Sequence, residues 1–166
     1  MGRNNRASFQ VWSAAHGYPG DGWYREFHRK DTTSGIHYWA LTDKDCDLGD
    51  KVLYDPAQAF NKTKDHAEHF VDMAYHLMKD HYEATGEHRL VMTSFDTELY
   101  GHWWYEGVEW LKHVIRLFHE REGVNISTSS EYLENYPPRN AIKLPETTWG
   151  QGGHYWVWNN HHTDWM

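Results

Sequence analysis

The sequence has little that would cross-link the chain or insert it into a membrane. Its 166 residues contain one cysteine, Cys46, so no disulfide can form within the chain and a reducing compartment is expected. No apolar run approaches the roughly 20 residues that span a bilayer. Residues 1–10 lack the apolar core of a secretory signal. These absences predict a cytoplasmic location.

Positive charge is also scarce. The chain has 16 Lys and Arg residues against 24 Asp and Glu residues, which gives a net charge of −8. Nucleic-acid backbones and anionic membrane surfaces both attract basic surfaces. The charge therefore argues against a nucleic acid or a membrane as partner. The length fits one domain with a sizeable core.

Aromatic residues and histidines are abundant instead. There are 10 Trp, 11 Tyr and 6 Phe residues, together with 14 His. Trp and Tyr combine a flat apolar face with a polar tip, and sugar rings present C–H faces to such surfaces. Many of these aromatic residues lie in polar, glycine-rich stretches such as 152–158. Their placement favours a binding surface over a core.

Hydrophobic periodicity predicts helices that alternate with short strands. Asp55 and Pro56 are typical of a helix start and Gly86 of a helix end, with apolar residues at helical spacing between them. A second amphipathic helix is expected from Val108 to Phe118. Further expected elements are strands at 36–41, 88–95 and 124–128, a helical turn at 23–29, and a short helix capped by Ser129 or Ser130. A long helix followed by a buried strand indicates an α/β fold.

The densest group of chemically active side chains lies at residues 93–107. This segment follows the expected strand at 88–95, and catalytic residues of β/α barrels lie at the C-terminal ends of strands. Asp96 is the first acid after that strand and could protonate a glycosidic oxygen, although an Asp in this place is more often a loop or helix cap. Glycoside cleavage needs a second carboxyl group. The candidates that stay open are Glu98, Glu131 and Glu146.

Residues 95–107, FDTELYGHWWYEG, resemble the fourth signature region of glycoside hydrolase family 57 branching enzymes. Other stretches are similar to the same family and follow its order: 10–27, 48–56 and 130–153. These blocks cover most of the chain, and the aromatic and acidic motif at 95–107 is highly specific.

The resemblance implies an α/β fold that is the second half of a partial (β/α)7 barrel, an incomplete TIM-like barrel. Residues 1–128 would form this half barrel, and residues 129–166 would hold the last signature region and an aromatic, glycine-rich substrate loop. The implied reaction is retaining cleavage of an α-1,4-glucan, such as amylose or glycogen, and transfer to a 6-hydroxyl, as in a 1,4-alpha-glucan branching enzyme. No metal or organic cofactor is implied.

The resemblance also implies roles for individual residues. Asp96 matches the general acid/base. Five residues are expected to bind substrate: Arg25, His102, Trp103, Trp104 and Trp149.

Several parts of the family pattern have no counterpart in these residues. The family's nucleophilic Glu and its first signature region would precede residue 1, and its C-terminal helical domain would follow residue 166. Two alternatives therefore stay open. The chain could be a non-catalytic glucan-binding remnant, or one half of a split enzyme that binds a missing N-terminal half of the barrel through exposed sheet edges. An α-amylase of the same family is a less favoured third alternative.

Histidine pairs raise the question of a metal site. His66 and His69 are three residues apart on the expected long helix, and His161 and His162 are adjacent. Zinc sites add Cys residues or a third spaced ligand, and the sequence shows no such set. We therefore expect no metal site, and we expect His66 and His69 on a solvated helix face.

Overall fold

The computed structural model describes residues 2–13, 15–43, 45–148 and 150–165, which form two compact units, Met1–Ser127 and Thr128–Met166. The first unit holds the helices α1 (Asn5–Trp12), α2 (Pro56–Thr85) and α3 (Gly107–Glu120), with 3₁₀ turns η1 (Tyr18–Gly20), η2 (Leu48–Asp50) and η3 (Thr97–Leu99). The second unit holds α4 (Ser129–Asn135) and η4 (Gln151–Gly153). None of the described helices is both long and apolar enough to cross a membrane.

The longest helix, α2, begins and ends where its sequence predicts. The Asp55 side chain accepts hydrogen bonds from the backbone N–H groups of Ala57 at 2.9 Å and Gln58 at 3.3 Å. Pro56 follows at the first helical position, where its missing N–H costs nothing. Gly86 ends the helix with a left-handed φ of 71°, and its N–H donates to the Tyr82 carbonyl. The predicted helix is therefore confirmed at both ends.

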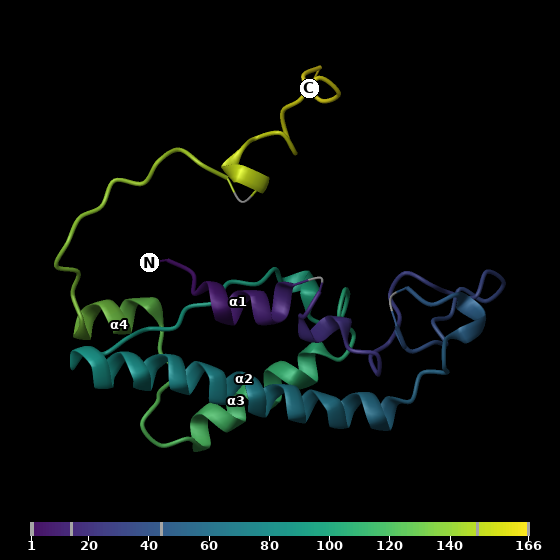
Figure 1. Cartoon of the computed structure of the whole chain (residues 1–166), viewed down its shortest axis with the longest axis horizontal. Coiled ribbons are helices and arrows are strands. Elements are labelled where there is room, and N and C mark those ends of the chain that lie inside the picture. The colour runs from purple at the N-terminus through teal and green to yellow at the C-terminus, as the bar shows by residue number, and fades with distance from the viewer. Residues whose placement is uncertain (1, 14, 44, 149, 166) are drawn as a thin grey trace. The chain divides into compact units, whose positions relative to one another are not determined.

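The core of the first unit lies where α2 packs against α3 (Figure 1). The Phe70 ring of α2 meets the Trp110 ring of α3 edge to face, with ring centroids 5.1 Å apart. Helix α3 confirms the second predicted helix. The buried core residues are Ala7, Val11, Tyr18, Tyr24, Ala59, Ala67, Phe70, Val71, Met73, Leu99, Trp104, Trp110 and Val114.

Helix α1 lies in a region for which the sequence predicted no helix. Its N-cap Asn4 accepts a hydrogen bond from the Ala7 N–H at 2.9 Å. Only Ala7, Ser8 and Val11 are buried, so the helix presents too few large apolar residues to give a periodic signal. The helical turn expected at 23–29 is wrong, because that segment contains turn, bend and bridge residues but no helix.

The expected strands do not form among the described residues, where the β-structure consists of isolated bridges such as Arg25 to Ala40 and Trp39 to Leu53. With the other described residues, the segment 89–95 makes one backbone hydrogen bond, from the Asn4 N–H to the Met92 carbonyl at 2.7 Å. It runs beside α1 (Figure 1). A strand requires a hydrogen-bonding neighbour, which the local sequence cannot supply. The described part of the chain is therefore helical, and the predicted α/β pattern is absent from it.

In the second unit, α4 is capped by Thr128, whose side chain accepts a hydrogen bond from the Glu131 N–H at 3.2 Å. The helix is the one that we expected, although its cap is Thr128 and neither of the two serines. The glycine-rich segment beyond it closes on itself, because the Thr148 hydroxyl donates to the His154 carbonyl at 2.6 Å. Trp156 and Trp165 are exposed on this segment.

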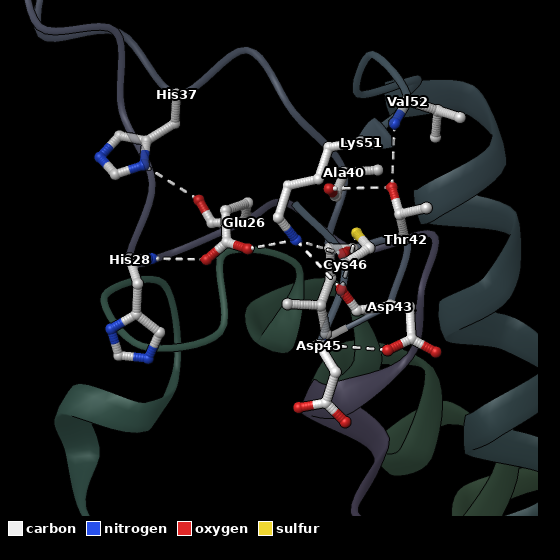
Figure 2. A network of polar contacts seen from close by, with 11 residues as sticks. Glu26, His28, His37, Ala40, Thr42, Asp43, Asp45, Cys46, Lys51 and Val52 are labelled. Atoms are coloured by element: carbon white, nitrogen blue, oxygen red, sulfur yellow. Dashed lines mark hydrogen bonds and ion pairs between the residues drawn. The ribbon is translucent and has the colours of Figure 1, made fainter. Parts of the chain in front are cut away.

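A buried ion pair fastens the loops of the first unit (Figure 2). Lys51 Nζ lies 2.8 Å from Glu26 Oε2 and donates to the carbonyls of Leu41 at 2.6 Å and Asp43 at 3.3 Å. The other Glu26 oxygen accepts from the His28 N–H at 2.7 Å. Burial alone would raise the pKa of Glu26, but the hydrogen bonds from Lys51 and from the backbone outweigh burial and lower it. The pair therefore joins the loop at 24–28 to the loop at 40–51.

We expect Trp110→Ala to destabilise the protein by about 3–5 kcal/mol, because it removes a buried ring from the α2–α3 contact. Urea unfolding followed by far-UV circular dichroism measures this change. Val108→Ala is the control, because Val108 is exposed on the same helix and should change stability by less than about 0.5 kcal/mol. Equal effects of the two substitutions would contradict the assigned core.

We expect Lys51→Met to cost about 3–5 kcal/mol at pH 7, because it leaves the buried Glu26 carboxylate without a cation. The folded-state pKa of Glu26 is lowered, so the pair stabilises the fold above the ordinary Glu pKa and loses this effect as the pH falls below it. The difference from the unsubstituted protein should therefore be largest at pH 7 and should shrink below about pH 4. Urea unfolding at a series of pH values measures it. Lys79→Met is the matched control, because Lys79 pairs with Glu83 at an exposed position, and its effect should stay below about 1 kcal/mol.

Candidate functional site

The motif at 95–107 folds into a tight turn between η3 and α3. The Trp103 N–H donates to the Glu98 carbonyl at 3.1 Å, and the Trp104 N–H donates to the Leu99 carbonyl at 2.8 Å. These consecutive bonds hold the two adjacent tryptophans in opposite surroundings. Trp103 is 52% exposed, whereas Trp104 is 2% exposed.

Trp104 belongs to the core. Its ring centroid lies 5.3 Å from those of Tyr24 and Trp110, which pack against it. A ring in this position has no free face for a sugar. The predicted stacking role of Trp104 is therefore wrong, because the turn directs its side chain inward.

Trp103 lies on an exposed aromatic surface. Its ring centroid is 4.6 Å from that of Phe27. The centroid of the His102 ring lies 5.5 Å from that of the same Phe27 ring. We call these three residues the Phe27–His102–Trp103 surface. The structure thus brings together two of the predicted substrate-binding residues and adds Phe27, which the sequence had not singled out.

Asp96 is exposed immediately before η3. Its carbonyl accepts the Leu99 N–H at 3.1 Å, but its side chain makes no capping hydrogen bond. The alternative role of a side-chain cap is therefore not realised at this position. Glu98 is also exposed, two residues along the turn, and Glu131 and Glu146 belong to the second unit.

Arg25 is held in place through its backbone and also through its side chain. Its N–H donates to Glu106 Oε1 at 3.1 Å. Its guanidinium carbon lies 3.6 Å from the centroid of the Tyr105 ring, which is a close cation–π contact. Glu106 and Tyr105 lie within the motif at 95–107, but spacing alone gave no reason to choose them. Acidic side chains are rarely buried, and the burial of Glu106 can be seen only in the structure.

Two tyrosine–histidine pairs hold the loop that leads to Arg25. The Tyr18 hydroxyl lies 2.7 Å from His69 Nδ1, and the Tyr24 hydroxyl lies 2.7 Å from His66 Nδ1. Burial raises the pKa of both phenols, so each O–H stays protonated and can donate to its histidine. His66 Nε2 faces Asp21 Oδ2 at 3.4 Å.

This arrangement corrects the expectation of a solvated position for His66, which is half-buried, whereas His69 is exposed as expected. They bind the loop at 17–24 to α2, and His66 also faces an acid. Among the described residues, no three His, Cys, Asp or Glu side chains form a group that could hold a metal ion. Trp149, the last predicted substrate-binding residue, lies outside the described residues.

Similar proteins were found by sequence. No family model matches the chain. A 1,4-alpha-glucan branching enzyme of Thermococcus kodakarensis is 46% identical over 164 residues, which is 98% of this chain and 24% of that enzyme. A probable 1,4-alpha-glucan branching enzyme of Mycobacterium tuberculosis is 35% identical over 159 residues, which is 96% of this chain and 30% of that protein.

Similar solved structures include two branching enzymes and an α-amylase. The crystal structure of the Thermococcus enzyme, a GH57 branching enzyme in complex with glucose, has a TM-score of 0.90 and is matched over 98% of this chain and 30% of its own. A GH57-type branching enzyme of Pyrococcus horikoshii also gives a TM-score of 0.90, at 41% identity and the same coverage. The α-amylase AmyC of Thermotoga maritima gives 0.72 at 34% identity, over 80% of this chain and 29% of its own.

Both searches match nearly the whole of this chain to one part of a longer enzyme. The chain spans 24% to 30% of the length of the branching enzymes that it matches. The chain is therefore a homologue of the GH57 branching enzymes over that part of their length, which confirms the family that its motifs indicate.

Proposed function

We propose that the chain is the part of a 1,4-alpha-glucan branching enzyme that carries its general acid/base. The observation that supports this most strongly is the match to the Thermococcus enzyme, at 46% identity and a TM-score of 0.90 over 98% of this chain. The substrate would be an α-1,4-glucan such as amylose or glycogen. A role in glycogen biosynthesis and a cytoplasmic location belong to the same proposal.

Asp96 is the proposed acid/base. In a retaining reaction it protonates the leaving glycosidic oxygen and then takes a proton from the 6-hydroxyl of the acceptor. Its side chain is exposed and makes no capping hydrogen bond to η3, which supports this role. The second carboxyl group, the nucleophile, would come from a part of the enzyme outside these residues, in keeping with the family pattern.

Arg25, His102, Trp103 and Trp149 are the proposed glucan-binding residues. The Phe27–His102–Trp103 surface offers an exposed ring on which the C–H face of a sugar could stack. Arg25 lies two residues before Phe27, so one short loop contributes to both contacts. Trp104 takes no part, because it is buried.

The proposed fold is one part of a (β/α)7 barrel. The backbone of residues 89–95 supports this proposal. It makes one hydrogen bond among the described residues, although Leu90, Val91 and Met92 are half-buried. Backbone polar groups that are withdrawn from water need partners. We propose that this segment becomes a strand when the remainder of the barrel, in the same or a second polypeptide, lies beside it.

An α-amylase activity is the second candidate. The match to AmyC favours it, but with a TM-score of 0.72 over 80% of this chain it is the weaker match. A non-catalytic glucan-binding remnant is the third candidate. The three differ in what they do to amylose: they branch it, hydrolyse it, or bind it unchanged.

We expect that a chimera of the Thermococcus enzyme, in which this chain replaces the homologous segment, branches amylose. In that chimera Asp96→Asn should lower the rate about 10²–10⁴-fold, the usual contribution of a general acid/base. Branches are counted by debranching and chain-length analysis. The matched control is Glu98→Gln, which removes the same charge two residues away and should leave the rate within a factor of about 2.

The other possible results of the chimera experiment each favour a different candidate function. A folded chimera that binds amylose without changing it indicates a remnant, and one that only shortens amylose indicates an α-amylase. Retention of branching by the Asp96→Asn chimera would remove Asp96 from the mechanism. The chain by itself should be inactive, because it spans so small a part of the relatives.

We expect Trp103→Ala to weaken amylose binding by the isolated chain about tenfold, because it removes an exposed stacking ring. Affinity electrophoresis in gels that contain amylose measures the change. Phe9→Ala is the control, since Phe9 is an aromatic residue on α1 that is at least as exposed as Trp103. Equal losses in the two variants would indicate non-specific binding to aromatic surface.

A further inference from the structure

We propose that Glu106 is a positioning residue for glucan binding, which acts by holding Arg25 over the ring of Tyr105. The inference rests on the proposed function and deepens it. It assigns a role to three residues that the motif alone did not distinguish: Tyr54, Tyr105 and Glu106.

Glu106 is a buried acid whose hydrogen bonding is incomplete. It is 1% exposed. Its Oε1 accepts the Arg25 N–H at 3.1 Å, and its Oε2 makes no hydrogen bond of normal geometry among the described residues. Removing a carboxylate from water is costly unless it is paired and hydrogen-bonded. A residue of this kind is a poor choice for stability alone.

The helix does not explain Glu106 either. Glu106 occupies the N-cap position of α3, but its side chain makes no capping hydrogen bond. The side chain reaches a residue 81 positions away in the chain, in the loop that carries Arg25. Its described hydrogen bond therefore fixes the loop and leaves the helix end uncapped.

Tyr54 is the polar neighbour of this carboxylate. Burial, and then the neighbouring Glu106, raise the pKa of the Tyr54 hydroxyl. The phenol therefore stays protonated and is the group that can donate to Oε2. Arg25 and Tyr105 also act on this hydroxyl electrostatically, so these four residues form one cluster.

Arg25 is held in the cluster, and its side-chain donors make no hydrogen bond to another described residue. Its guanidinium carbon lies over the Tyr105 ring, 3.6 Å from the centroid, and it forms no ion pair among the described residues. The two acids nearest to it in the sequence have other partners, since Glu26 binds Lys51 and Asp21 faces His66. A guanidinium has five N–H donors in a fixed plane, which suits paired acceptor oxygens.

The charge of the cluster indicates the kind of ligand. The Glu106 carboxylate offsets the charge of Arg25, so the pair offers directed donors with little net attraction for an anion. Neighbouring hydroxyls of a neutral sugar fit such donors better than a phosphate does. The Phe27–His102–Trp103 surface continues from the same loop and would take the apolar face of the same chain. The geometry thus joins hydrogen bonding and stacking to one glucan.

A double-mutant cycle on the full chain tests this inference. Amylose dissociation constants are measured by affinity electrophoresis for Arg25→Ala, Glu106→Gln and the double variant. Glu106→Gln is nearly isosteric and should fold, but its neutral amide accepts a weaker hydrogen bond from the Arg25 N–H than a carboxylate does, and an NH2 group replaces one of the two carboxylate oxygens. We expect Glu106→Gln to weaken binding about fivefold and Arg25→Ala about tenfold, with the double variant no weaker than Arg25→Ala, because residues that act through one another are not additive.

Two further comparisons separate positioning from structure. Tyr105→Phe keeps the ring under the guanidinium and should bind amylose normally, whereas Tyr105→Leu should bind as weakly as Arg25→Ala. Glu109→Gln, on the same helix but partly exposed, is the charge control and should bind normally. Inorganic phosphate at millimolar concentration should not compete with amylose.

The inference is wrong if the losses of Arg25→Ala and Glu106→Gln multiply in the double variant, or if Glu106→Gln binds normally. Normal binding by Arg25→Ala together with weak binding by Trp103→Ala would overturn the inference and leave the proposed function in place. Absence of any amylose affinity in the unsubstituted chain would overturn the inference, whereas the proposed function is decided by branching in the chimera.

Discussion

The ring of Trp110 lies where the helices and the loops of the first unit meet. It packs against Phe70 of α2, against Tyr18 of the loop before Arg25, and against Tyr100 and Trp104 of the motif turn. A large ring surrounded on these sides fixes the distance between α2 and α3 and also the surface on which both loops rest. The candidate site is therefore built on the same contact that holds the helices together.

Polar contacts then determine the path of the first loop over this core. The loop at 17–28 is bound through Tyr18 and Tyr24 to two histidines, through Arg25 to Glu106, and through Glu26 to Lys51. Buried polar groups stabilise little but require a unique arrangement, because any other arrangement leaves them unpaired. A loop that is held in this way presents Arg25 and Phe27 in fixed positions. Such positioning is what a binding surface needs, since ordering the loop beforehand lowers the cost of binding.

Local sequence was sufficient where local physics decides the structure. The cap at Asp55, the proline after it and the left-handed Gly86 are local features, and α2 begins and ends at them. Strands depend on partners elsewhere, so the apolar run at 88–95 predicted a strand that the described residues do not form. The histidines of α2 could not be assigned from spacing, because their partners Tyr18 and Tyr24 are distant in the sequence. The family could be identified from the sequence because the motif at 95–107 is recognised by its residues alone, whether or not the rest of the barrel is present.

The motif at 95–107 combines two duties in adjacent residues, and this explains why its sequence is so dense. Trp104 and Glu106 face inward, where one fills the core and the other binds the Arg25 backbone. Trp103 and Tyr105 face outward, where one meets Phe27 and the other lies under the Arg25 guanidinium. Because successive residues alternate between these roles, shifting the register by one would place an aromatic surface residue in the core and a buried acid in water. A change at Trp104 or Glu106 therefore disturbs the packing beneath the surface, whereas a change at Trp103 or Tyr105 alters the surface itself.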